Sequence, residues 1–193
     1  MKKIFIIILL LFTKVATAQE LQFMTSTNTH RVAFEYMNTI KNHTIYGYSE
    51  VGINDSVYSY TQIYYEYSIV KYLGVHAEYR NMLFNSSRWQ NTFIVGCSVP
   101  VLGHKYGYIS LYPLYRYDRA HMWQATAAYG FNYKFITFDG YFDLYGDKRI
   151  NAYSENKLKF HIDRFFVGVN IEYSLSPSHS LVTPYILVGV EFN

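Results

Sequence analysis

The segment ITFDGYFDLY, residues 136–145, carries the pattern that decides the fold of this chain. Apolar and polar side chains alternate along it, with Ile136, Phe138, Phe142 and Leu144 on one side and Thr137, Asp139, Tyr141, Asp143 and Tyr145 on the other. Successive side chains of a β-strand point to opposite faces, whereas those of a helix repeat about every 3.6 residues. The period of two therefore predicts a strand with one apolar and one polar face.

The same alternation recurs along most of the chain. It predicts twelve strands, with ten as the alternative count, at residues 20–28, 31–38, 43–53, 57–69, 73–83, 90–101, 106–117, 122–133, 135–146, 155–163, 165–175 and 183–192. Strands of about ten residues with this pattern are typical of transmembrane β-barrels, which turn apolar side chains to lipid and polar ones inward. We therefore expect an all-β fold, a closed antiparallel transmembrane β-barrel.

The connections between these strands alternate in length. Short turns are predicted at 39–42, 70–72 and 102–105, near Lys134 and near Asp163, and longer outer loops at 52–56, 84–89, 147–154 and 176–182. Bacterial barrels have short periplasmic turns and longer external loops, with both termini in the periplasm. The alternation therefore favours a membrane barrel over a soluble sandwich.

The N-terminus has the features of a secretory signal peptide. Lys2 and Lys3 precede an apolar run, residues 4–12, and Ala16-Thr17-Ala18 provides a cleavage site. The run is too short for a spanning helix, which needs roughly 20 residues. We expect a signal peptide at residues 1–18, a barrel domain at residues 19–193 and a location in the bacterial outer membrane.

The composition of the chain limits which partners and which environment the protein can have. The signal peptide takes three of the 17 basic residues and none of the 14 acidic ones, so the mature chain is formally neutral and a nucleic-acid partner is not expected. Cys97 is alone, which excludes an intramolecular disulfide. Tyrosine accounts for 22 of 193 residues, and barrels use such amphipathic rings as girdles at the membrane interfaces.

Three segments carry a resemblance to a known group of proteins: LYPLYRYDR at 111–119, TFDGYFDLY at 137–145 and VGVNIEYS at 167–174. Residues 65–68 and HAEYR at 76–80 look similar too. With them, the chain resembles an uncharacterised outer-membrane barrel family grouped with the nucleoside-specific channel-forming (Tsx-like) proteins. The resemblance implies a twelve-stranded barrel that passes nucleosides or similar small solutes.

The polar faces of the strands define the candidate binding residues, because they would line the lumen. These candidates are Tyr64, Glu66, Glu78, Arg80, Tyr112, Arg116, Asp139, Tyr141, Asp143, Lys157, Lys159 and Glu172. A turn near residues 134–135 sets Gly130 opposite Asp139, Ala128 opposite Tyr141 and Thr126 opposite Asp143.

The next strand is expected to bring a basic row, Lys157, Lys159 and His161, beside this acidic row. Paired rows would form either an ion-pair network that fills the barrel or a polar track for a zwitterionic solute. If the two lysines line the conduction path, their replacement by Glu should shift ion selectivity toward cations. The inward rings of Tyr64, Tyr112, Tyr141 and Tyr145 would either stack on nucleobases or fill volume.

We expect an outer-membrane, porin-like channel for passive diffusion of small polar solutes, such as nucleosides. The alternatives are a structural or plugged barrel without transport and, with less support, a lipid-modifying barrel enzyme. No G-x-S-x-G motif occurs, and the seven histidines lack metal-ligand spacing, so we assign no catalytic residue, metal or cofactor. Asp139 and Asp143 would lie about 13 Å apart on one strand, too far for a glycosidase pair.

The expected partners are those of a membrane barrel. They are the lipid bilayer with its lipopolysaccharide, the outer-membrane assembly machinery and a small polar solute such as a nucleoside. A monomer is expected.

Overall fold

The structure, a computed structural model, describes residues 18–27, 29–53, 58–84, 88–118, 121–147, 149–177 and 179–192. The signal peptide predicted for residues 1–18 therefore lies, apart from Ala18, outside the described residues. The described part of the chain has no helix long and apolar enough to cross a membrane.

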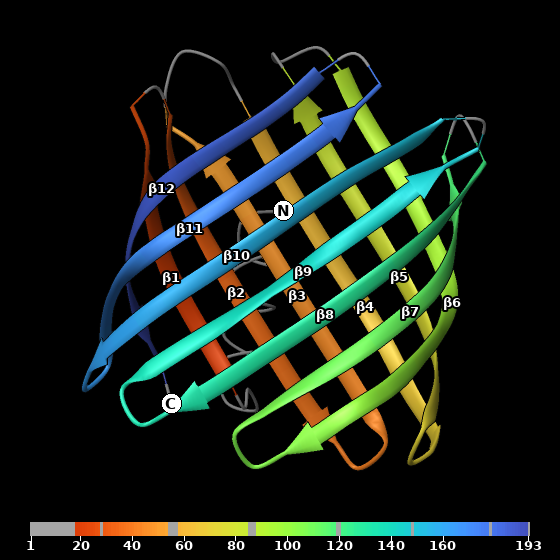
Figure 1. Cartoon of the computed structure of the whole chain (residues 1–193), viewed down its shortest axis with the longest axis horizontal. Helices are drawn as coiled ribbons and strands as arrows, with labels where there is room; N and C mark the ends of the chain where they lie inside the picture. Colours follow the sequence, from red (N-terminus) through yellow and green to blue (C-terminus); the bar gives the residue numbers. More distant parts are fainter. Residues whose placement is uncertain are drawn as a thin grey trace, which may run out of the picture.

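The described residues form twelve β-strands (Figure 1). The strands are β1 (Ala18–Thr25), β2 (His30–Ile40), β3 (His43–Gly52), β4 (Tyr58–Val70), β5 (Leu73–Phe84), β6 (Arg88–His104), β7 (Gly107–Tyr117), β8 (Met122–Tyr133), β9 (Ile136–Gly146), β10 (Ile150–Ile162), β11 (Phe165–Ser176) and β12 (His179–Glu191). Each strand pairs antiparallel with its neighbours in the chain, and β1 pairs with β12. The predicted closed antiparallel barrel of twelve strands is confirmed.

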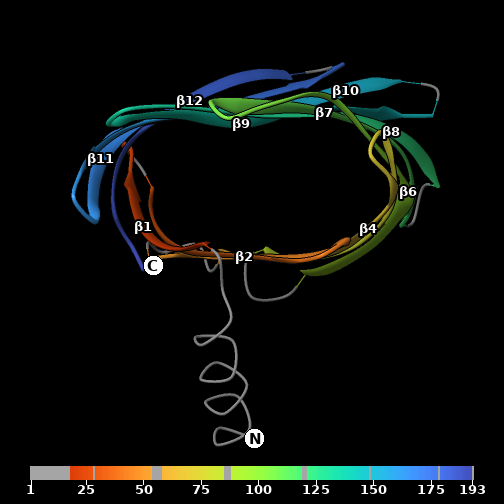
Figure 2. The same ribbon diagram turned by 90° about the horizontal axis from the view of Figure 1, so that it is seen from below.

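Closure depends on the seam between the first and last strands. The register there runs from Glu20 opposite Glu191 to Thr25 opposite Ile186. The Phe192 N–H also donates to the carbonyl of Gln19, at 2.9 Å. The resulting ring is oval in cross-section, with β2 and β4 along one long side and β7, β9 and β10 along the other (Figure 2).

One rim of the barrel carries five two-residue turns, at residues 41–42, 71–72, 105–106, 134–135 and 163–164. Lys41, Lys134 and Asp163 have positive φ values of 54–55°, as the tightest hairpin turns require. The described ends of the chain lie at this same rim, because Ala18 pairs with Met37, close to the 41–42 turn, and β12 ends beside β1.

The predicted bounds of two loops at the opposite rim, residues 147–154 and 176–182, were wrong, because strands begin inside them. Residues 150–154 belong to β10, where Ile150 pairs with Gly146 and Ala152 pairs with Leu175. Similarly, β12 begins at His179, which pairs with Ser176. Asn and Ser have low strand propensity, but pairing with neighbouring strands overrides this local preference.

The outer surface of the barrel is apolar. On β11, Phe165, Val167, Val169 and Ile171 point outward and keep 43% to 66% of their surface exposed, while the alternate residue Asn170 is fully buried. An apolar exterior around a closed sheet suits hydrocarbon, which offers exposed side chains no hydrogen-bond partner.

Glycines opposite aromatic rings let large side chains lie flat against the sheet. Gly130 pairs with Tyr108, and a Cβ at Gly130 would lie 2.6 Å from the Tyr108 ring. Gly189 pairs with Phe166, whose ring a Cβ at Gly189 would overlap. That Cβ would also lie 2.6 Å from the backbone oxygen of Leu21, across the closing seam. Such glycine–aromatic pairs are a known device for curving sheets.

Gly189→Ala is therefore expected to destabilise the barrel by about 1–3 kcal/mol, the usual cost of overpacking. The matched control is Gly47→Ala, because nothing lies within 4 Å of a Cβ at Gly47; its effect should stay within about 0.5 kcal/mol. Urea unfolding of the barrel in detergent micelles measures both values. Equal stability of the two variants would contradict the packing at the seam.

Candidate functional site

The interior of the barrel is polar, and side chains from opposite walls contact one another across it. Arg80 on β5 reaches Asp143 on β9 at 3.4 Å, and Lys157 on β10 reaches Glu35 on β2 at 3.7 Å. These strands are not neighbours in the sheet. The contacts therefore cross the lumen, as the oval cross-section allows (Figure 2).

All twelve candidate residues lie on the inward-facing positions of their strands. All twelve take part in ion pairs or ring contacts. Ten of them are Tyr64, Glu66, Glu78, Arg80, Tyr112, Asp139, Asp143, Lys157, Lys159 and Glu172. The other two are Arg116 and Tyr141. Arg116 lies near the end of β7 that is farther from the two-residue turns and forms an ion pair with Asp118, and the Tyr141 ring packs on Tyr153.

The predicted register between β8 and β9 is confirmed, with Gly130 opposite Asp139, Ala128 opposite Tyr141 and Thr126 opposite Asp143. The Thr126 hydroxyl donates to Asp143 at 2.6 Å. On β10, Lys159 contacts Asp139 at 3.3 Å, as the paired rows predict.

Asp143 departs from that prediction, because its ionic partner is Arg80 and not a lysine of β10. The prediction considered only strands adjacent along the chain. It could not include a partner on the opposite wall.

A repeated arrangement organises these charges: four interior cations, Arg31, Arg80, Lys157 and Lys159, are each shared by two carboxylates. Arg31 contacts Glu50 at 3.1 Å and Glu172 at 2.8 Å. Arg80 lies in the same way between Glu78 and Asp143. A charge taken out of water requires such close partners, because its desolvation is costly.

The two lysines of β10 repeat the arrangement. Lys157 contacts Glu35 at 3.7 Å and Glu155 at 3.2 Å. Lys159 contacts Glu20 at 2.8 Å and Asp139 at 3.3 Å. Both lysines are buried, so they hold the walls together as well as carrying charge.

Acidic groups are therefore in excess. The ion pairs of the described residues join eleven different carboxylates to five lysine or arginine side chains and two histidines. With neutral histidines, this set carries a net negative charge. The formally neutral composition of the mature chain hides this asymmetry.

Sequence reasoning missed several members of this network: Glu20, Arg31, Glu35, Glu50 and Glu155. A signal was present, because Arg31, Ala33 and Glu35 alternate with apolar Val32 and Phe34. The period of two therefore marks them as inward-facing, although nothing in it identifies their partners across the lumen.

The inward aromatic rings pack on one another. Tyr64 stacks on Tyr46 with ring centroids 4.7 Å apart and lies 5.0 Å from the ring of His76, which is 5.3 Å from Tyr112. Tyr145 lies under the Arg116 guanidinium, 4.7 Å from it. These contacts fill volume, and the series from Tyr46 to Tyr112 also presents flat rings to the interior.

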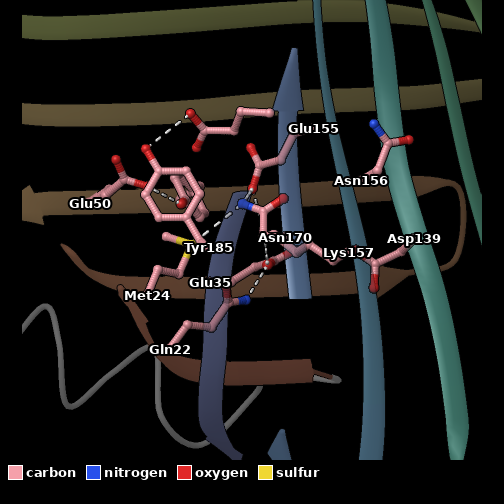
Figure 3. Close-up of polar contacts among 12 residues, drawn as sticks. Gln22, Met24, Glu35, Glu50, Asp139, Glu155, Asn156, Lys157, Asn170 and Tyr185 are labelled. Atoms are coloured by element: carbon pink, nitrogen blue, oxygen red, sulfur yellow. Dashed lines mark hydrogen bonds and ion pairs between the residues drawn. The ribbon is translucent and has the colours of Figure 1, made fainter. Parts of the chain in front are cut away.

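Two buried amides lie against the carboxylates of this network (Figure 3). The Gln22 amide nitrogen donates to Glu20 at 2.7 Å and to Glu35 at 3.1 Å. The Asn170 amide nitrogen donates to Glu155 at 3.2 Å. No group of three or more metal-ligating side chains with suitable geometry occurs among the described residues.

Neither the protein-family models nor the curated proteins match this chain. Solved structures do match. The KdgM porin in complex with disordered oligogalacturonate is 12% identical with a TM-score of 0.62, covering 92% of this chain and 99% of its own. The NanC porin is 10% identical with a TM-score of 0.61, covering 91% and 98%.

LpxR from Salmonella typhimurium is also similar, at 6% identity and a TM-score of 0.55, covering 91% of this chain and 99% of its own. At these identities the likenesses establish the fold. The chain has the closed barrel fold of porin-like outer-membrane proteins.

Proposed function

We propose that this protein is a bacterial outer-membrane channel for the passive diffusion of small polar solutes. The observation that carries the proposal is a polar interior that is not entirely filled. The side chains of Glu35 and Asp139 keep 27% and 29% of their surface exposed inside a closed barrel with an apolar exterior. A wholly packed interior would instead favour the alternative of a plugged barrel without transport.

Other parts of the proposal concern delivery and assembly. A signal peptide at residues 1–18 would export the chain, and the outer-membrane assembly machinery would insert it as a monomer into a bilayer with lipopolysaccharide. The similarity in fold to the KdgM and NanC porins supports a channel more than a lipid-modifying enzyme.

Stepwise ion conductance is the first expected result. The barrel, refolded in detergent and added to a planar bilayer in KCl, should produce discrete current steps. A heat-unfolded sample of the same protein serves as the control. A correctly folded barrel that inserts without carrying current would rule out the channel.

Lys159→Gln is expected to shift ion selectivity toward cations. Lys159 neutralises Glu20 and Asp139, so its loss leaves two interior carboxylates without that ammonium. Glutamine is preferable to glutamate here, because a third carboxylate would add repulsion. Coulomb attraction at 4 Å in water corresponds to about fivefold per charge, which sets the scale for the change in the K⁺/Cl⁻ permeability ratio.

The matched control for Lys159→Gln is Lys134→Gln, which removes an exposed lysine from a turn outside the lumen. Reversal potentials in a KCl gradient measure both variants. An unchanged ratio in Lys159→Gln would remove this lysine from the conduction path.

Nucleosides are the specific solute that we propose from the resemblance, and the ring series Tyr46–Tyr64–His76–Tyr112 supports it. A nucleobase can stack on such rings, with about 1–3 kcal/mol per base. Adenosine should therefore reduce the ion current. In Tyr64→Leu the half-blocking concentration should rise at least about fivefold, the lower end of that range.

Tyr65→Leu is the control for the stacking test, because Tyr65 is the next residue and points outward. Equal block of Tyr64→Leu and Tyr65→Leu by adenosine would show that the ring series does not bind nucleosides.

A further inference from the structure

The interior of the barrel carries more carboxylates than cationic side chains. The proposed channel function does not by itself say which solutes this excess of negative charge would favour. We infer that the lumen binds and passes cationic amines, with Glu35 and Asp139 as their contact residues. This inference rests on the proposed channel and adds a class of substrate to it.

The first argument is the charge around the two lysines of β10. Four carboxylates, those of Glu20, Glu35, Asp139 and Glu155, contact the ammonium groups of Lys157 and Lys159. The set therefore stays negative although both lysines are present. Rings of acidic side chains select cations in channels by the same attraction.

The second argument is that a solute in the lumen can reach two of these carboxylates. Among these four carboxylates, Glu35 and Asp139 keep the most exposed surface, whereas Glu20 and Glu155 keep 17% and 11%. Glu35 lies on β2 and Asp139 on β9, on opposite long sides of the oval, and they bind lysines two residues apart on β10. A solute in the lumen would meet these two carboxylates first.

The third argument comes from two buried amides. The side-chain oxygens of Gln22 and Asn170 have no hydrogen-bond partner, and both residues are 0% exposed. The orientation of each amide follows from its nitrogen, which donates to Glu20 and Glu35 or to Glu155. The unpartnered oxygens therefore lie beside the acidic set (Figure 3).

These oxygens determine which ligand chemistry fits. A buried acceptor without a partner is unfavourable, and a hydrogen-bond donor removes that cost. An alkylammonium group has three donors and a positive charge, so it suits both the carboxylates and the amide oxygens. A carboxylate-bearing solute has neither feature and would be repelled.

The protein itself illustrates this mode of binding. The Lys159 ammonium lies between a carboxylate of β1 and one of β9, and the Lys157 ammonium between one of β2 and one of β10. A free primary amine would make the same contacts with the exposed sides of Glu35 and Asp139.

The test uses the double variant Glu35→Gln/Asp139→Asn and spermidine as the probe. Each lysine keeps one partner in this variant, because Lys157 retains Glu155 and Lys159 retains Glu20. The barrel should therefore fold, which circular dichroism and heat-modified gel mobility verify. Asp163→Asn is the matched control, since Asp163 is exposed in a turn outside the lumen.

Two measurements are made on each protein. Calorimetric titration of the folded barrel in micelles measures spermidine binding, and planar bilayers measure the K⁺/Cl⁻ permeability ratio and block by spermidine or by oligogalacturonate, a polyanion. The wild type and Asp163→Asn should be cation-selective and should be blocked by spermidine but not by oligogalacturonate. The double variant should lose about fivefold in affinity per carboxylate removed, on the scale of a charge pair in water.

The outcomes separate the inference from the channel proposal. Spermidine binding that depends on Glu35 and Asp139, in a barrel that does not conduct, supports the amine site and overturns the channel. Conductance with anion selectivity, or block by oligogalacturonate and not by spermidine, overturns the inference and leaves the channel standing. Equal spermidine affinity of the double variant and the wild type also overturns the inference.

Discussion

Backbone hydrogen bonding across the closing seam is the constraint on which the rest of this structure depends. Hydrocarbon contains no water to pair with the open edge of a sheet, so a membrane-spanning sheet must return to its first strand. The pairing of β1 with β12 meets this requirement. Once the ring is closed, each side chain faces either lipid or the lumen, which explains the sharp division between an apolar exterior and a polar interior.

The oval shape of the ring gives the interior its chemistry. Because the long walls approach each other, side chains such as Arg80 and Lys157 reach carboxylates on strands that are not their neighbours. Partly buried charges need close partners to offset desolvation. The sharing of Arg31, Arg80, Lys157 and Lys159 by two carboxylates each provides partners for these cations and leaves an excess of negative charge. The same contacts therefore hold the walls together and create the field that a solute would meet.

Tyrosine contributes to both environments, because its ring is apolar and its hydroxyl is polar. Tyr72, Tyr106 and Tyr133 are exposed near the rim with the two-residue turns, where interfacial girdles are expected. Tyr46 and Tyr64 instead stack inside the barrel. The composition indicated the girdles, but only the inward positions show how much of the interior these rings fill.

The alternation of side chains determined the fold. A period of two was sufficient to predict twelve strands, their antiparallel order, the places of five short turns and even the register that sets Thr126 opposite Asp143. It could do so because strand direction and hairpin pairing are local properties. Local pattern was less informative at residues 150–154, where pairing with neighbouring strands overrides weak strand propensity.

Tertiary structure alone decided which charges meet across the lumen. The sequence indicated that Asp143, Lys157 and Glu172 face inward, but their partners Arg80, Glu35 and Arg31 lie on other walls of the barrel. Those contacts depend on how far the ring is flattened, which is a property of all twelve strands together. The excess of negative charge in the lumen therefore became visible only when the closed barrel had separated inward from outward charges, in a chain whose overall charge balances.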